Sequence, residues 1–434
     1  MSEPLVAVEL ARWVDPASVF LDQHARDEHA FWLDAGPGAA EGWSWVGTGV
    51  PEDDPGAVRA VVCATADPGD GWPAGRFRGG WVGWAGYDAA AARADAPAEV
   101  DDASPEQSWL RVDRFVAFDH GSRRAWAVAP ARDVRTLAAT AARATEPAEP
   151  AAPATAARAR PRHAAGEYAE LIERCRDAIR EGDAYQLCLT TRFSIDAAVD
   201  PVDAYRRLRA ATPAHHGGLV RTGGVALASA SPERFLEVEH GVVRTRPIKG
   251  TRPRGKDPMT DAALAEELRT DEKERAENVM IVDLMRNDLS RVCDAGSVGV
   301  DALLQVESYP AVHQLVSTVS GTLTPGTTVG GLLDAAFPAG SMTGAPKLSA
   351  MTILHELERG PRGVFSGCFG WVGDDGALDL AMVIRSIVVH PGGAYVGAGG
   401  GITWRSDAAA EVAEVGIKAR GPLAALGAEL PPGW

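Results

Sequence analysis

The chain has 434 residues, 46% of them apolar, and a formal net charge of −16. This length suggests two or three domains or one large sheet domain, with apolar content enough for a sizeable core. The acidic balance argues against a nucleic acid or an anionic membrane as partner, so an anionic substrate would need locally placed cations or a metal. No run of about 18 apolar residues is present, which predicts that no segment spans a membrane.

The five cysteines are scattered along the chain, and none forms a Cys-x-x-Cys pair. This spacing favours reduced thiols over a disulfide framework or a zinc site, and it predicts a cytoplasmic protein. The first residues include Glu3 and Glu9 and lack a basic segment followed by an apolar one. We therefore expect no signal peptide.

The N-terminal third is rich in tryptophan, and its short apolar runs are broken by Gly, Pro and Asp. This pattern predicts a β-rich segment over 1–137, with a buried strand in the alternating stretch 79–88. Residues 138–164 are almost entirely Ala, Pro, Arg, Thr and Glu, which predicts an exposed linker. A third segment, 165–421, differs in character from both.

Apolar spacing in this third segment predicts both helices and strands. Helices are expected at 167–183, 201–210, 260–292, 329–336, 345–358 and 408–420. Strands are expected at 184–195, 225–229, 234–239, 242–248, 364–372, 378–390 and 394–398. Because the two types mix without a strict βαβ alternation, we predict an α+β fold with largely antiparallel sheets.

Lys249 lies in the pentapeptide Pro-Ile-Lys-Gly-Thr (247–251), at the end of a predicted strand. Only five of the 43 basic residues are lysines, so the chain strongly prefers arginine. Lysine, unlike arginine, can lose its proton when desolvated and then act as a nucleophile or base. A surface lysine in a turn explains the pentapeptide equally well.

Two predicted helices carry regularly spaced glutamates. Glu274 and Glu277 are three residues apart, and Glu411, Glu414 and Lys418 follow an i, i+3, i+7 pattern, so each set shares one helical face. Carboxylates from two helices can hold Mg²⁺ together with an anionic ligand. An ordinary solvated face is the alternative for either helix.

Two loops offer donors for an anion. The glycine-rich stretch 397–407 precedes the second glutamate helix, with Asp407 as the expected N-cap, and its backbone N–H groups can approach an anion closely. The Gly/Ser/Thr loop in 337–351 leads into a helix at Pro346, a favourable first helical residue. An ordinary helix entry would explain the second loop as well.

Three further side chains are candidates for a site. Glu233 lies sixteen residues before Lys249 at the start of a neighbouring strand, where a surface carboxylate is the alternative. His313 lies beside apolar residues, where a lone histidine is more often part of the core than a catalyst. Arg385 stands in an apolar predicted strand and therefore needs an anionic partner, either a ligand or a structural carboxylate.

Seven motifs occur in an order that resembles the chorismate-utilising enzymes, which include anthranilate, aminodeoxychorismate, isochorismate and salicylate synthases. These motifs are SPERF, PIKGT, KERAENVMIVDLMRND, PAVHQLVS, GSMTGAPK, IRSIVV and AGGGITWRSDAAAEVAEVGIK. The resemblance covers roughly 165–420, and the N-terminal part is similar to the family more weakly. It implies two large, mainly antiparallel sheets packed face to face, with helices outside.

Lys249 distinguishes members within that family. It resembles the branch that replaces the 4-hydroxyl of chorismate with an amino group, whereas anthranilate synthases typically carry alanine there. The resemblance implies that Lys249 attacks C2 while Glu233 protonates the departing hydroxyl, and that ammonia then adds at C4 and expels the lysine. Lys249 acting only as a general base is the alternative.

The resemblance also implies a cofactor and a substrate site. Mg²⁺ would be bound directly by Glu277 and Glu414, and through water by Glu274 and Glu411. His313 would be a catalytic residue near the ring. The substrate-binding residues implied are Gly250, Thr251, Ser341, Phe365, Arg385, Gly399, Gly400, Gly401 and Lys418. Phe365 stands where anthranilate synthases carry a substrate-contacting tyrosine.

Two departures from the family concern regulation and ammonia supply. Ala35 and the segment 212–216 differ from relatives that bind tryptophan, which makes tryptophan feedback doubtful. No Gly-x-Cys-x-Gly glutaminase elbow is present, so we expect a separate glutamine amidotransferase subunit to supply ammonia. The alternatives are an anthranilate, aminodeoxyisochorismate or isochorismate synthase. A non-catalytic chorismate-binding protein is disfavoured because Lys249, Glu233 and the four glutamates are all present.

Overall fold

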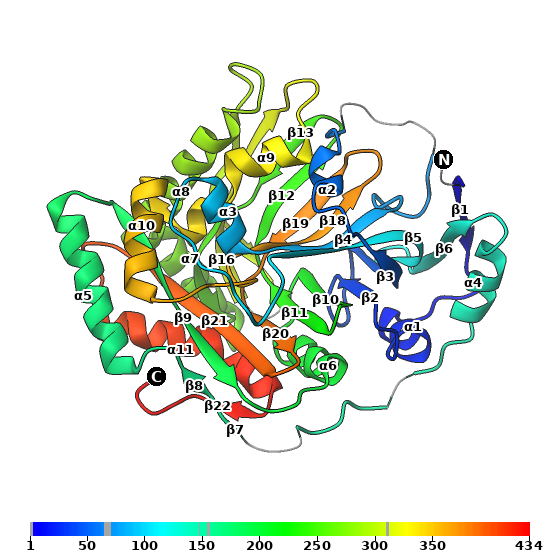
Figure 1. The fold of residues 1–434 in the computed structure, drawn as a ribbon, viewed down its shortest axis with the longest axis horizontal. Helices are drawn as coiled ribbons and strands as arrows, with labels where there is room; N and C mark the ends of the chain where they lie inside the picture. Colours follow the sequence, from blue (N-terminus) through cyan, green and yellow to red (C-terminus); the bar gives the residue numbers. More distant parts are fainter. Residues whose placement is uncertain (1–2, 65–70, 147, 154–156, 310–311) are drawn as a thin grey trace.

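The computed structural model describes the whole chain except residues 1–2, 65–70, 147, 154–156 and 310–311 (Figure 1). Most of its strands join into one hydrogen-bonded network with two limbs that diverge at β5 (Gln107–Asp119). The strand pairs of this network are antiparallel. A short parallel pair, β7 (Ala157–Arg158) with β22 (Ala428–Glu429), stands apart from it. The predicted α+β fold with antiparallel sheets is therefore confirmed.

The first limb starts at the N-terminal strand and ends beside the glycine-rich strand. Its order is β1 (Leu5–Glu9), β6 (Arg124–Pro130), β5, β3 (Trp43–Pro51), β2 (Ala30–Asp34), β10 (His216–Thr222), β11 (Val225–Ser231), β20 (Ser386–His390), β21 (Gly393–Ile402) and β9 (Gln186–Ile195). Two short strands also pair with β9, namely β8 (Arg160–Pro161) and β17 (Gly344–Ala345).

The second limb leaves β5 at residues 107–112, along the edge whose later part pairs with β6. Its order is β4 (Gly80–Ala85), β18 (Cys368–Gly373), β19 (Leu378–Met382), β12 (Arg234–Glu239), β13 (Val242–Thr245) and β16 (Val312–Thr322). Both β14 (Ile248–Pro253) and β15 (Gly299–Ser308) pair with β16.

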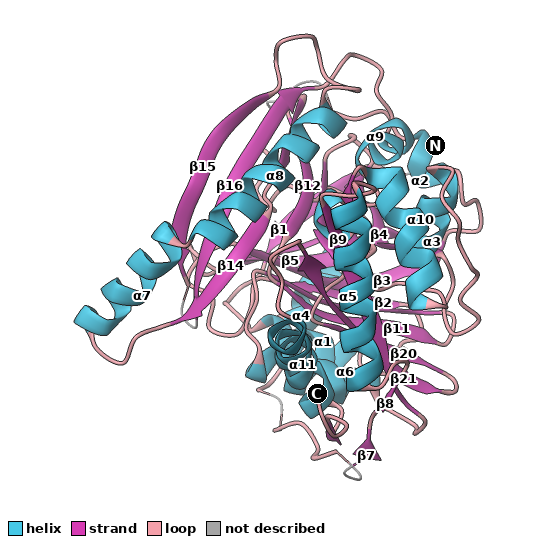
Figure 2. Cartoon of the chain, turned by 90° about the vertical axis from the view of Figure 1, so that its left-hand side faces the viewer, coloured by secondary structure: helices cyan, strands magenta, loops and turns pink. Residues whose placement is uncertain are grey.

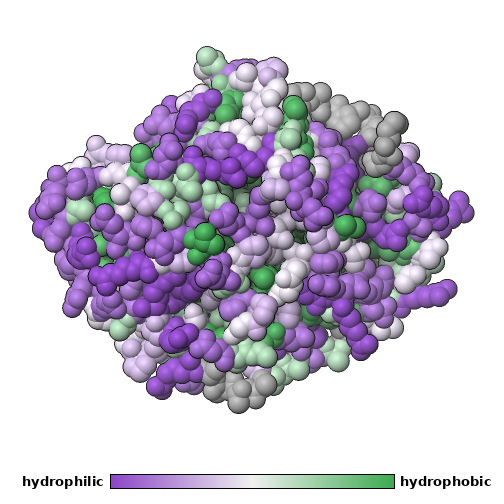
Figure 3. Space-filling model, in the orientation of Figure 1, coloured by the Kyte–Doolittle hydropathy of each residue, from purple (hydrophilic) through white to green (hydrophobic). Residues whose placement is uncertain are grey.

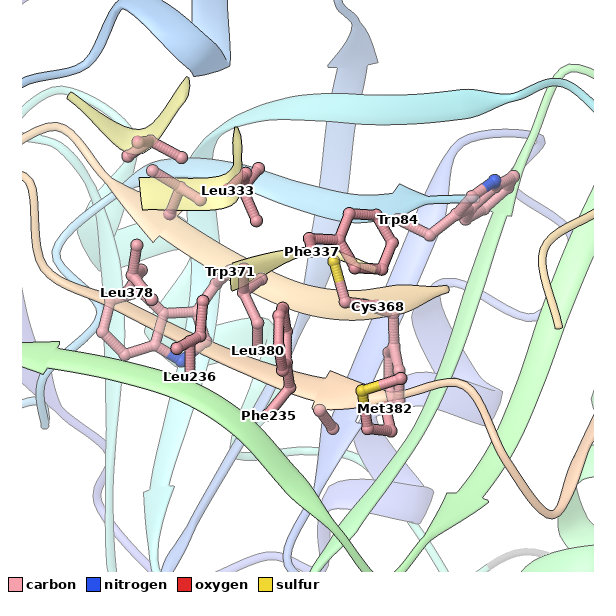
Figure 4. Close-up of a cluster of buried hydrophobic side chains, with 14 of the residues drawn as sticks. Trp84, Phe235, Leu236, Leu333, Phe337, Cys368, Trp371, Leu378, Leu380 and Met382 are labelled. Atoms are coloured by element: carbon pink, nitrogen blue, oxygen red, sulfur yellow. The ribbon is translucent and has the colours of Figure 1, made fainter. Parts of the chain in front are cut away.

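Side-chain alternation along the strands divides the core into two layers. On β10, Val220 packs in the cluster shared by the two limbs, whereas the preceding residue, Leu219, packs in the cluster beneath the outer helices. The shared cluster contains Leu236 and Trp371 from the second limb, surrounded by other large apolar side chains (Figure 4). The two sheets therefore pack face to face, as the family resemblance implies.

Helices cover the outer faces of both limbs (Figure 2). The first limb is covered by α1 (Pro16–Gln23), α4 (Val134–Ala141), α5 (Ala165–Glu181), α6 (Pro201–Ala211) and α11 (Ala408–Ala425). Against the strands β14, β15 and β16 of the second limb pack α7 (Pro258–Thr270) and α8 (Glu272–Leu289). The remaining helices are α2 (Ala57–Ala60), α3 (Tyr87–Arg93), η1 (Gly340–Met342), α9 (Val329–Ala336) and α10 (Lys347–Glu358).

The face of the molecule in Figure 3 is mostly hydrophilic, with apolar side chains scattered over it. Among the residues that the structure describes, no helix combines the length and apolar character needed to cross a bilayer.

Several predicted helices and strands are interrupted, or have other ends, in the structure. The helix expected at 260–292 is two helices, because Asp271 adopts an extended conformation and caps α8 by accepting a 3.0 Å hydrogen bond from the Glu274 N–H. The strand expected at 378–390 is interrupted at Arg385, and the strand expected at 242–248 ends at Thr245. Pro346 is the N-cap of α10 and not its first helical residue.

Strands from the N-terminal third lie inside both sheets. Antiparallel pairing joins β2 to β10 and β4 to β18. Residues 1–137 therefore complete the same sheets that carry 165–421. The three-part division at 137 and 164 stays a prediction about domain organisation.

Candidate active site

Lys249 is held at the inner end of β14 by an irregularity in the strand. The pairing of β14 with β16 shifts register between Lys249 and Thr251, where Gly250 has a φ of +76°. A side chain at Gly250 would lie 2.6 Å from Leu268 Cδ1 and 3.1 Å from the Glu274 carboxyl carbon. Only glycine fits both this conformation and this close approach. The turn brings Lys249 Nζ within 3.9 Å of Glu277 Oε2.

Lys249 stays protonated, although burial alone would favour its neutral form. Burial acts to lower its pKa, but the negative charge of Glu277, with contributions from Glu233 and Glu414, raises that pKa above the ordinary value. The amine is therefore an ammonium ion in the free protein at neutral pH. It must lose a proton before it can act as a nucleophile.

Glu233 precedes β12 and is buried. The Ser341 hydroxyl donates a 3.1 Å hydrogen bond to Glu233 Oε1. Burial raises the pKa of Glu233 to about 7, although Lys249 and Ser341 both act to lower it. A carboxyl with this pKa can hold a proton at neutral pH and release it, as a general acid requires.

The four glutamates lie on two neighbouring helices, as predicted. Glu274 and Glu277 are on α8, and Glu411 and Glu414 are on α11. Lys273 Nζ, on α8, bridges the helices by donating a 3.1 Å hydrogen bond to Glu411 Oε1. The sequence had indicated only that each pair shares a face, and this bridge shows that the two faces meet.

The cluster is rich in negative charge that its lysines offset only in part. Burial, reinforced by the neighbouring Glu277 carboxylate, raises the pKa of Glu274, and burial likewise raises that of Glu277. For Glu414, Lys418 at 2.8 Å outweighs burial and lowers the pKa.

The donor set fits a hard divalent cation. Glu277 Oε1 is buried, has no hydrogen-bond partner in the described part of the chain and lies 4.0 Å from Lys273 Nζ, so it can still accept a closer donor or cation. Within the described residues, however, no three His, Cys, Asp or Glu side chains are gathered closely enough to hold a metal ion. The Mg²⁺ site therefore stays a prediction.

The glycine-rich strand β21 passes directly over this cluster. A side chain at Gly400 would lie 3.3 Å from Glu411 Oε2 and 3.9 Å from Lys418 Nζ. Lys418 Nζ donates a 2.9 Å hydrogen bond to the Gly399 carbonyl. Because Gly400 and Gly401 carry no side chains, this part of the strand stays open beside the charged groups. As predicted, Asp407 caps α11, by accepting a 2.9 Å hydrogen bond from the Ala410 N–H.

Arg385 has the features of an anion-binding residue. It takes a left-handed backbone conformation, with φ of +52°, in the turn between β19 and β20. Its side chain is half-buried and makes no ion pair or hydrogen bond with any residue that the structure describes. Burial lowers the pKa of Arg385, against the attraction of Glu414. Of the two partners expected for this arginine, the structural carboxylate is absent from the described residues.

Three further predicted site residues are His313, Phe365 and Thr251. The ring nitrogens of His313 are both engaged, Nε2 with Asp261 at 2.9 Å and Nδ1 with Ser308 at 2.8 Å. Phe365 is buried in the core between the sheets, with its ring against the Gly397 backbone. Thr251 is exposed. His313 is buried, as expected for a core histidine. Its catalytic role stays a prediction.

Sequence reasoning missed several buried polar residues beside the site. Asn278 is fully buried on α8, accepts a 2.5 Å hydrogen bond from the Ser317 hydroxyl and donates to the Leu315 carbonyl at 3.3 Å. Lys347 Nζ pairs with Asp288 at 2.7 Å and ties α10 to α8. The scarcity of lysine could have signalled Lys347, because four of the five lysines pair with carboxylates.

We predict that Lys347→Met destabilises the protein by roughly 3 kcal/mol, because it leaves the buried Asp288 carboxylate without its partner. The free energy of unfolding, measured by urea denaturation, checks this expectation. The matched control is Lys256→Met, since Lys256 is exposed. Equal stability of the two variants would contradict a structural role for the Lys347 pair.

A separate cavity of about 410 Å³ lies on the other side of the strands that carry Glu233 and Lys249. Its lining includes Ala35, His215 and His216, so the two segments related to tryptophan feedback in the sequence do meet in one place. Pro232 and Ile248 also line it, which makes this cavity a neighbour of the charged centre.

Comparison with known proteins identifies the family. A model of the chorismate binding enzymes matches residues 49–424, and this chain belongs to that family. The match extends into the N-terminal third, in agreement with the strands that this third contributes to both sheets.

Individual relatives fall into two groups. The chain is 43% identical over 382 residues to an aminodeoxychorismate synthase of Streptomyces pristinaespiralis, covering 84% of this chain and 53% of that protein. It is 40% identical over 446 residues to an anthranilate synthase component 1 of Streptomyces coelicolor, covering 95% and 86% of the two chains. It thus spans about half the length of the Streptomyces aminodeoxychorismate synthases it matches.

Among solved structures, anthranilate synthase component I of Streptococcus pneumoniae superposes with a TM-score of 0.75 at 28% identity. That comparison covers 97% of this chain and 92% of the other. The expected family fold is therefore confirmed over nearly the whole length.

Proposed function

We propose that this chain aminates chorismate at C4, as component I of an aminodeoxychorismate synthase, and so makes 4-amino-4-deoxychorismate for p-aminobenzoate and folate. The observation that carries the proposal is the place of Lys249. Its amine lies 3.9 Å from Glu277 in a buried site, and its charge acts on Glu233, whose pKa of about 7 suits an acid. The 43% identity to an aminodeoxychorismate synthase supports the same activity.

In the proposed reaction, the Lys249 ammonium first gives one proton to solvent. The resulting amine then forms a bond to C2 of the ring as the C4–oxygen bond breaks. The electron pair of that bond leaves with the 4-hydroxyl, and Glu233 donates the proton that makes it water. Ammonia then forms a bond to C4, and the C2–nitrogen bond to Lys249 breaks. The Glu233 carboxylate takes a proton from the new ammonium group, which restores the acid for another turnover.

Substrate carboxylates are bound, in this proposal, by cations and backbone donors already near Lys249. Arg385 and Lys418 supply positive charge, and the N–H groups of Gly399 to Gly401 line the open strand. Gly250 and Thr251 lie beside the amine, and Ser341 reaches Glu233. His313 and Phe365 would lie near the ring.

We further propose Mg²⁺ as cofactor, with Glu277 and Glu414 as direct ligands and Glu274 and Glu411 acting through water. When bound, the ion would hold the ring carboxylate and offset the negative charge of the glutamates. The unpartnered Glu277 Oε1 supports this assignment.

We predict that Glu277→Gln lowers Mg²⁺-dependent turnover by about 100-fold or more, because an amide is a poorer ligand than a carboxylate. Isothermal titration calorimetry should show a matching loss of Mg²⁺ affinity. The control is Glu272→Gln on the same helix, since Glu272 is exposed. Normal turnover by Glu277→Gln without added metal would reject the site.

We propose that a glutamine amidotransferase partner supplies the ammonia and that both proteins act in the cytoplasm, where the five free, buried cysteines would stay reduced. Free ammonium should replace that partner in the test tube. Incubation with chorismate, Mg²⁺ and ammonium, followed by mass spectrometry, tests the function. The expected product is 4-amino-4-deoxychorismate.

The second candidate is an anthranilate synthase component I, favoured by the 40% identity to the Streptomyces coelicolor protein over 95% of this chain. That reaction has no need for a lysine at position 249. Anthranilate as the main product of the same incubation would overturn the first proposal in favour of this one, and isochorismate would overturn both.

A further inference from the structure

Arg362 is a buried arginine that the proposed reaction does not use. It follows α10, is only 3% exposed, and its guanidinium forms a bidentate pair with Glu358 of α10, at 2.7 and 2.8 Å. The guanidinium carbon also lies over the ring of Tyr87 from α3, 4.2 Å from the ring centre. A buried ion pair contributes little net stability by itself, so the informative feature is what the remaining donors of this arginine hold.

These remaining donors join two backbone carbonyls from different elements. Nη1 of Arg362 donates a 2.6 Å hydrogen bond to the Met342 carbonyl in η1, and Nη2 donates a 2.9 Å hydrogen bond to the Cys188 carbonyl in β9. The Cys188 N–H in turn donates to the Thr343 carbonyl at 2.8 Å. The turn that begins with η1 is thus fastened to β9 by a direct hydrogen bond and by the Arg362 bridge.

The turn held in this way carries Ser341. This buried residue directly precedes Met342 and donates the 3.1 Å hydrogen bond to Glu233 Oε1. The turn also packs against α8, since a side chain at Gly340 would lie 2.3 Å from Leu284 Cδ2. With these supports on the residues at either side of it, the Ser341 hydroxyl is kept within hydrogen-bonding distance of the Glu233 carboxyl.

We propose that Arg362 is a positioning residue, which holds the Met342 carbonyl and so keeps the Ser341 hydroxyl on Glu233. Arg362 acts on the acid through Ser341, whose hydrogen bond lowers the pKa of Glu233 against the effect of burial. Release of the turn should therefore raise that pKa. The inference rests on the proposed function, because the role of Glu233 as an acid comes from there.

Two variants release the Met342 carbonyl without changing the net charge. Arg362→Lys keeps the positive charge beside Glu358 but lacks the planar set of donors that reaches both carbonyls. The double variant Arg362→Met with Glu358→Met removes one charge of each sign and refills the space with apolar side chains. It keeps the test open if the single variant is unstable, because apolar replacement of a whole buried pair is usually tolerated.

The matched control is Arg192→Lys. Arg192 is likewise paired with a buried carboxylate, that of Asp101 at 2.9 Å, and it holds the Pro361 carbonyl instead of that of Met342. This substitution removes a comparable set of hydrogen bonds and should leave the pKa of Glu233 unchanged.

The pKa of Glu233 is measured without turnover. The free energy of unfolding of each protein is compared, from pH 5 to about pH 9, with that of its counterpart that also carries Glu233→Gln, and the pH dependence of the difference reports the pKa. Both Arg362 variants should raise it by roughly 0.5 to 1, the equivalent of one hydrogen bond. Ser341→Ala should raise it equally, and addition of Arg362→Lys to Ser341→Ala should raise it no further.

An unchanged pKa in both Arg362 variants would overturn the inference, and so would a second rise when Arg362→Lys is added to Ser341→Ala. With chorismate and ammonium, the fall of kcat/KM at high pH should move upward to the same extent as the pKa. If the wild-type protein makes no product from chorismate, the proposed function fails, whereas the change in the pKa of Glu233 is still measured and decides the positioning role by itself.

Discussion

Lys249→Ala should abolish amination of chorismate at C4, with a fall in kcat of about 10³-fold or more, because the variant lacks the group that attacks C2. Chorismate should still bind, since Arg385 and the open glycine strand are untouched. Product formation is followed by mass spectrometry, and binding by calorimetry. Loss of both together would point to collapse of the site and not to loss of the nucleophile.

Two further measurements separate the roles open to Lys249. Lys249→Arg keeps the positive charge near Glu277 but cannot attack, so it should be as inactive as the alanine variant. Under ammonia-free conditions, the wild-type protein should accumulate an adduct at Lys249 with the mass of chorismate less water. Retained activity in the arginine variant, or no adduct, would reduce Lys249 to a binding or proton-carrying residue. The exposed Lys256 provides the control substitution.

Glu233→Gln should lower kcat by about 10²- to 10⁴-fold, the usual effect of removing a positioned general acid. Since the pKa of Glu233 is raised to about 7, its acid form dominates below that pH and is lost as the pH rises through it. The wild-type kcat/KM should therefore fall above pH 7. Ser341→Ala should move this fall to higher pH, because the Ser341 hydrogen bond acts to lower that pKa.

The same raised pKa of Glu233 also makes the stability of the protein depend on pH. Between the ordinary carboxyl value of 4.5 and about 7, the folded state holds a proton that the unfolded state has released. Stability therefore falls as the pH rises across this range, by about 3 kcal/mol in total. Glu233→Gln should remove this loss and be more stable than the wild type at pH 8. Equal stability of the two proteins at that pH would argue against a raised pKa.

Local signals in the sequence predicted much of the fold. The helix at 167–183 was correct because its apolar spacing ends at Gly182, which takes a left-handed conformation. The merged helix at 260–292 was wrong because Asp271 reads equally well as a helical residue and as a cap. No local pattern could assign β4 to the strand β18, because that pairing joins residues almost three hundred positions apart.

In the candidate site, too, local spacing predicted some residues, whereas features that depend on contacts between distant segments were missed. Glu274, Glu277, Glu411 and Glu414 were found because their spacing places them on helical faces, and Gly401 because it lies in a glycine-rich stretch that can approach an anion closely. Gly250 was named only through the family resemblance. The charge state of Lys249 was not predictable, since it depends on Glu277 across a fold contact.

The insertion of β4 between β5 and β18 has a consequence for how the protein forms during synthesis. The edge of β4 that receives β18 stays bare until the ribosome has made residue 373, so the second sheet cannot be continuous before then. Distant pairing of this kind slows folding and leaves a strand edge open to wrong partners. Until β18 has been made, the tryptophan-bearing strand β4 is therefore the part of this sheet most open to wrong pairing.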